Sequence, residues 1–143
     1  MEIQLLPAVS LLPETLSVLV APEDMLARAL NGNPHRQQFR ILFITSIRSG
    51  VLSRLDRELI VELIVRRAFT SVQLRTILEE NHHPFLIVEH RRYERARDMA
   101  GHVAQVLKQA SREATILMCA PALDRQPEAM VEFADRVFCF YDM

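Results

Sequence analysis

Six short apolar runs, separated by amphipathic or polar stretches, are the feature that most constrains the fold of this chain. Each run holds four to six apolar residues, rich in Val, Ile, Leu and Phe, without strict alternation of apolar and polar positions. Runs of this kind are typical of strands covered on both faces in a parallel sheet. They occupy residues 15–21, 39–46, 62–68, 84–90, 114–120 and 136–142.

Helical patterns fill most of the intervals between the runs. We expect helices at 23–30, at 70–80 with Thr70 as N-cap, at 93–112, and at 127–135 with Pro127 in the first turn. Residues 31–38 read as a turn or loop, and 46–57 as a polar excursion containing Gly50. The alternation predicts an α/β fold: a three-layer sandwich with a mostly parallel central sheet of about five or six strands.

Length and composition favour a single domain over residues 1–143. Half of the residues are hydrophobic, and no internal repeat or low-complexity segment marks a boundary. The N-terminal segment, MEIQLLPAVSLLP, carries two prolines, which a strand tolerates at the edge of a sheet. We therefore expect it to form a further edge strand.

The charge balance gives no general attraction to nucleic acid or to an anionic membrane. Lys and Arg total 17 against 18 Asp and Glu, for a net charge of −1, so any such binding must come from a local patch. No apolar run reaches the roughly 18 residues of a membrane span, and the start lacks a basic segment. Cys119 and Cys139 lie in apolar runs, where we expect buried, reduced thiols. These features favour the cytoplasm.

The stretch ELIVRRAFTSVQLRTILEENHHPFLIVEH, residues 62–90, resembles part of the RecA/RadA-type recombinases and their paralogues. In both, a strand ends in an Arg-Ala-Phe-like turn, a helix containing Gln-Leu follows, and the next apolar strand ends in an acidic residue. FRILFITSIRSG looks like the family's strand after the nucleotide helix, and ATILMCAPALDRQPEAMVEFADRVFCFYD is similar to its later strands. The resemblance implies a RecA-like (P-loop NTPase-like) core from about residue 15 to 142.

The segment at the family's phosphate-binding position departs from the family pattern. A phosphate loop needs G-x-x-x-x-G-K-[ST], because glycines turn consecutive amides toward the phosphates and the lysine neutralises them. APEDMLAR, residues 21–28, has no glycine, lysine, serine or threonine. Glu23 and Asp24 instead place anions at the start of the helix, where a carboxylate about 4 Å from a phosphate costs several kcal/mol. We expect neither ATP nor another cofactor to bind there.

Glu89 ends the strand LIV at the position that, by the resemblance, matches the family's magnesium-organising aspartate. Without a phosphate loop it has no magnesium nucleotide to organise. Neither Thr45 nor Ser46, at the end of an earlier strand, restores a base that would activate water. The alternative interpretation of Glu89 is a carboxylate at a strand end that pairs with a nearby arginine.

A basic cluster, HRRYERAR at 90–97, is the most functional-looking segment. Arginines with an aromatic residue grip phosphates and stack bases in nucleic-acid binding proteins. Glu94 and Asp98 interleave with them, however, so the same residues also fit a salt-bridged helix face. The candidate patch for nucleic acid or a partner comprises Arg48, Arg54, Arg91, Arg92, Tyr93 and Arg95, with Arg57 on the same polar excursion as Arg54.

Two other sets of residues are weaker candidates. His82, His83 and His90 with Glu89 raise the idea of a metal site, but adjacent histidines diverge in most backbone conformations, and we expect no metal. Cys119 as a nucleophile would need a base and an exposed, electropositive setting. Its place in ILMCA favours a small core residue instead.

Three functions remain open at this point. The first is a non-catalytic RecA/RadA-like domain without ATPase activity, acting as a regulatory or binding module in DNA recombination and repair. Its partner would be an active relative or a second copy, docked through a sheet edge or helix face. The second is a small-molecule- or nucleotide-binding α/β enzyme with an unrecognised site. The third is an oligomerising scaffold without a ligand.

Overall fold

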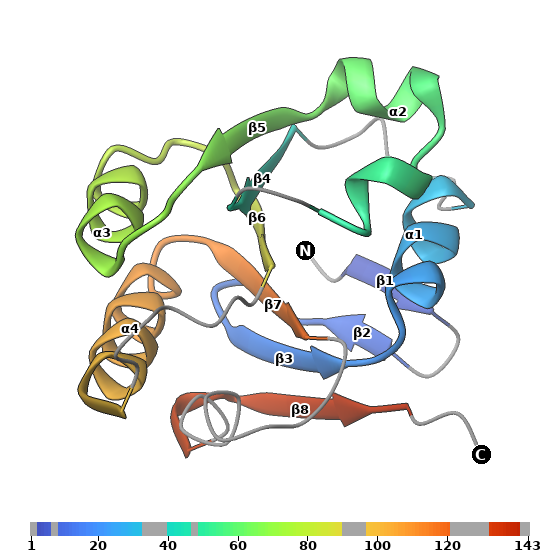
Figure 1. Ribbon diagram of the computed structural model, residues 1–143. Helices are drawn as coiled ribbons and strands as arrows, with labels where there is room; N and C mark the ends of the chain where they lie inside the picture. Colours follow the sequence, from blue (N-terminus) through green and yellow to red (C-terminus); the bar gives the residue numbers. More distant parts are fainter. Residues whose placement is uncertain are drawn as a thin grey trace.

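The computed structural model describes residues 3–6, 9–32, 40–46, 49–89, 97–120 and 132–140, with side chains of the last long helix described from His102 onward (Figure 1). The strands are β1 (Ile3–Leu6), β2 (Val9–Leu11), β3 (Leu16–Val20), β4 (Ile41–Thr45), β5 (Ile64–Arg67), β6 (Phe85–Glu89), β7 (Thr115–Ala120) and β8 (Arg136–Cys139). The helices are α1 (Glu23–Asn31), α2 (Arg57–Glu62), α3 (Ser71–Glu79) and α4 (Arg97–Ala110), with a 3₁₀ turn, η2 (Leu52–Arg54).

Six of the described strands form one parallel sheet in the order β5-β4-β6-β7-β3-β8. The first of these strands along the chain, β3, therefore lies between the last two (Figure 1). Each of the six falls within one of the predicted apolar runs. The prediction of an α/β fold with a mostly parallel sheet is confirmed.

Two apolar cores lie on the two faces of this sheet. Phe43 and Ile87 point to one face, which α1, η2, α2 and the N-terminal strands cover. Ile44 and Val88, their neighbours along the same strands, point to the opposite face, which α3 and α4 cover. Successive side chains of a strand alternate between faces, so a strand with a core on each side must be apolar at nearly every position. This explains the unbroken apolar runs.

We expected the N-terminal segment to add an edge strand to the large sheet, but it does not extend that sheet. β1 and β2 pair antiparallel with each other in a separate two-stranded sheet, with Ile3 opposite Leu11. Alternate residues of this hairpin are buried in the core on the α1 side. The alternating pattern, which differs from the continuous burial of β3, β4, β6 and β7, suits a strand with one covered face.

The polar excursion at 46–57 is more structured than its sequence indicates. Residues 52–54 form η2, and α2 begins at Arg57 directly after the extended residue Asp56. Leu55 and Leu59 bury their side chains in the core on the α1 side. Elsewhere α3 begins as predicted: the Thr70 side chain accepts a hydrogen bond from the Gln73 amide. Of the helix predicted at 127–135, residues 127–131 lie outside the described part of the chain.

The two end strands of the sheet are less buried than the sequence predicts. Most of β5 and β8 is exposed, although their apolar runs suggested two covered faces. Cys139, on β8, is correspondingly exposed, so the prediction of a buried thiol is wrong for this residue and confirmed for Cys119. A strand at the end of a sheet has one neighbour only, and sequence periodicity does not reveal which strand this will be.

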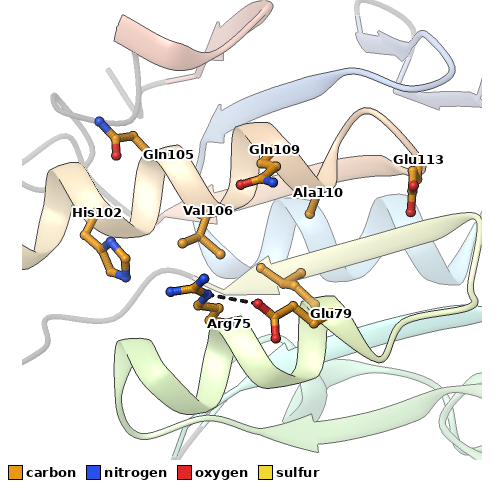
Figure 2. Close-up of a pocket in the computed structure, with 9 residues that line it drawn as sticks. Arg75, Glu79, His102, Gln105, Val106, Gln109, Ala110 and Glu113 are labelled. Atoms are coloured by element: carbon orange, nitrogen blue, oxygen red, sulfur yellow. Dashed lines mark hydrogen bonds and ion pairs between the residues drawn. The ribbon is translucent and has the colours of Figure 1, made fainter.

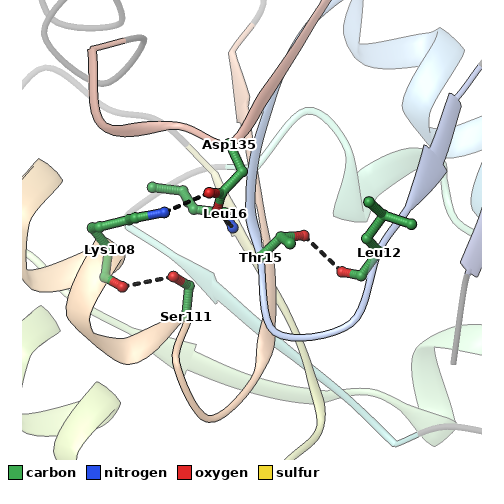
Figure 3. Close-up of polar contacts among 6 residues, drawn as sticks. All are labelled: Leu12, Thr15, Leu16, Lys108, Ser111 and Asp135. Atoms are coloured by element: carbon green, nitrogen blue, oxygen red, sulfur yellow. Dashed lines mark hydrogen bonds and ion pairs between the residues drawn. The ribbon is translucent and has the colours of Figure 1, made fainter.

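Asp135 fastens β8 to the rest of the sheet (Figure 3). One carboxylate oxygen accepts the Leu16 amide at 2.8 Å, and the other accepts Lys108 Nζ at 2.6 Å. Burial raises the pKa of Asp135, but the hydrogen bonds from Lys108 and Leu16 and the Lys108 charge together lower it below its ordinary value. A single side chain thus links β8, β3 and α4.

We expect Asp135→Asn to lower the free energy of unfolding by up to about 1 kcal/mol at neutral pH, because the ion pair is over a third exposed and screened by solvent. Because the pKa of Asp135 is lower in the folded state than in the unfolded state, its ionised carboxylate stabilises the fold above the ordinary aspartate pKa of about 4. This stabilisation is lost as the pH falls through the pKa of the folded state. Urea unfolding at several pH values should show the wild-type advantage shrink below about pH 4. An advantage that persists unchanged under acid conditions would contradict this assignment.

Candidate functional site

The carboxyl ends of the parallel strands meet at one edge of the sheet, where α/β proteins place their ligands. Thr45 ends β4 and Glu89 ends β6, on neighbouring strands. The helix after β4 packs on the α1 side and the helix after β6 on the opposite side. Such a reversal between adjacent strands is a topological switch point, the position at which a crevice is expected.

Glu89 is a buried carboxylate held by two hydroxyl groups. Thr45 Oγ1 donates to Glu89 Oε1 at 2.8 Å, and Ser49 Oγ donates to Oε2 at 2.7 Å. Ser49 Oγ also accepts the Leu52 amide at 2.9 Å, which orients its own hydrogen toward Glu89. Only 9% of Glu89 is exposed. Hydroxyls, rather than the arginine of our alternative interpretation, are the described partners of this carboxylate.

Ser49 and Gly50 connect Glu89 to the start of α1. The Glu23 carboxylate packs so closely on Gly50 that a Cβ at position 50 would overlap it. Glu23 and Glu89 therefore lie against adjacent residues of the loop that follows β4. Gly50 leaves the space that the Glu23 side chain fills.

A carboxylate at the start of a helix often caps it by accepting hydrogen bonds. The two acidic residues of α1 do not. Pro22 occupies the N-cap position, and no side chain accepts a capping bond there. Asp24 instead pairs with Arg28 one turn later at 3.0 Å, and both side chains are exposed. Glu23 and Asp24 act through their charge, which the positive end of the helix dipole favours.

The candidate basic patch is described only in part. Arg54 donates through Nη1 to the Gly50 carbonyl at 2.7 Å, so it braces the same loop that holds Glu89 and Glu23. Arg57 is the first residue of α2. Arg48, Arg91, Arg92, Tyr93 and Arg95 lie outside the described residues, and their grouping stays a prediction.

The histidine and cysteine candidates lie apart from this cluster of hydroxyls and carboxylates. His82 and His83 lie between α3 and β6, and the His83 amide donates to the Asn81 side chain. His90 lies outside the described residues. Within the described part of the chain, no group of three or more His, Cys, Asp or Glu residues has a geometry able to hold a metal ion. Cys119 is buried, and its thiol is 3.7 Å from the Val88 carbonyl oxygen.

A groove of about 410 Å³ lies between α3 and α4 (Figure 2). Its floor includes Val106 and Ala110, and the exposed ion pair of Arg75 with Glu79 lines one wall. None of the residues singled out from the sequence lines it. The carboxyl edge of the sheet is therefore the better candidate site, because three separate elements bring polar side chains together there.

The carboxyl-edge residues form a closed polar cluster: Glu23, Thr45, Ser49, Gly50 and Glu89. Thr45 and Glu89 share a face at the ends of two neighbouring strands, a placement that strand alternation indicates. Ser49 carries no comparable signal, since its position depends on the path of a loop. The five residues of the cluster include two carboxylates, and both oxygens of Glu89 already accept hydrogen bonds.

We expect Thr45→Val to lower the free energy of unfolding by about 1–3 kcal/mol, because a nearly isosteric side chain leaves Glu89 Oε1 buried without its donor. Thr76→Val is the matched control: its hydroxyl bonds to a carbonyl on the exposed surface of α3, so a change within about 0.5 kcal/mol is expected. Chemical denaturation measures both. Equal stability of the two variants would show that the Thr45 bond contributes nothing.

Comparison with known proteins adds two findings to this geometry. No protein-family model matches the chain, and no curated protein matches it.

Among the described residues, no helix has both the length and the apolar character needed to cross a membrane.

Proposed function

We propose that this chain is a non-catalytic RecA/RadA-like domain that serves as a binding or regulatory module in DNA recombination or repair. The observation that carries the proposal is the closed polar cluster at the carboxyl edge of the sheet. In a nucleotide-hydrolysing relative, this edge would hold phosphates and magnesium. Here Glu89 bonds to Thr45 and Ser49, and Glu23 fills the space beside Gly50.

Electrostatics support the absence of nucleotide binding in this proposal. A triphosphate at the start of α1 would meet Glu23 and Asp24, and the exposed Arg28 that pairs with Asp24 lies a full turn farther along the helix. A unit charge pair about 4 Å apart costs about 4 kcal/mol at an effective dielectric constant of 20. The positive end of one helix dipole, about half a charge, does not offset two such repulsions.

The first test is thermal unfolding with and without magnesium-ATP. A ligand at 100 times its dissociation constant would stabilise the fold by about 2.7 kcal/mol, so binding is easily detected. We expect no change in the melting temperature, whereas an ATP-binding protein measured in parallel should shift. A concentration-dependent increase for this chain would overturn the proposal of a closed nucleotide site.

The proposed partner is an active relative of the same superfamily, and exposed apolar side chains near β5 support it. Most of the large apolar side chains that are exposed in the described residues fall within one stretch of α2, β5 and the start of α3. We call Ile60, Val61, Val65, Phe69 and Val72 the β5 patch, because in the sequence they belong to β5 or flank it. Concentrated apolar exposure marks interaction surfaces more often than scattered residues do. β5 also ends the sheet and leaves backbone groups to which a partner's strand can pair.

The second test is co-purification with a RadA-type ATPase from the same genome. Phe69 and Val72 are 50% and 68% exposed, so Phe69→Glu with Val72→Glu should leave the fold intact. We expect the change to weaken partner binding at least about tenfold, because it buries charge in the interface. Gln105→Glu with Gln109→Glu, on the exposed face of α4, supplies the matched control. Unchanged binding of the Phe69 and Val72 variant would exclude this surface.

A further inference from the structure

We draw no further inference here: the strongest candidate, the exposed end strand β8 around Val137 and Cys139, has β3 as its one neighbour among the described strands, and nothing in the described part of the chain shows what covers its outer edge.

Discussion

Parallel alignment of six strands is the constraint from which the rest of this structure follows. Parallel neighbours require crossover connections, and these place helices on both faces of the sheet and demand apolar residues at nearly every strand position. The same alignment gathers all carboxyl ends at one edge. Thr45, Glu89 and the β3–α1 junction therefore become neighbours although they are far apart in the sequence.

The hydroxyl and carboxylate cluster at that edge shows how groups of the fold itself can satisfy a buried carboxylate. A buried carboxylate needs hydrogen-bond donors, and in a nucleotide-binding protein a metal and water would contribute to that role. Here Thr45 and Ser49 provide the donors. Glu23 supplies a negative charge at the helix start and also fills the space above Gly50. Internal contacts thus satisfy groups that would otherwise need a ligand.

Sequence reasoning succeeded where a local pattern determines the structure. The apolar runs located β3–β8, and Thr70 was found as the cap of α3 because capping depends on adjacent residues. It failed where the outcome depends on distant contacts. The exposure of Cys139 follows from the place of β8 at the end of the sheet, and the bond from Ser49 to Glu89 follows from a loop path. The N-terminal prolines fitted either an edge strand or the observed separate hairpin equally well.

The position of β3 between β7 and β8 has a consequence for synthesis on the ribosome. Leu16 pairs with Ile116, and Val20 pairs with both Ala120 and Cys139, so the first strand of the large sheet gains its two neighbours only after residues 115–139 have been made. At about 5–20 residues per second, this wait is on the order of ten seconds. During that time β3, of which four of the five residues are apolar, has neither of its neighbours in the sheet.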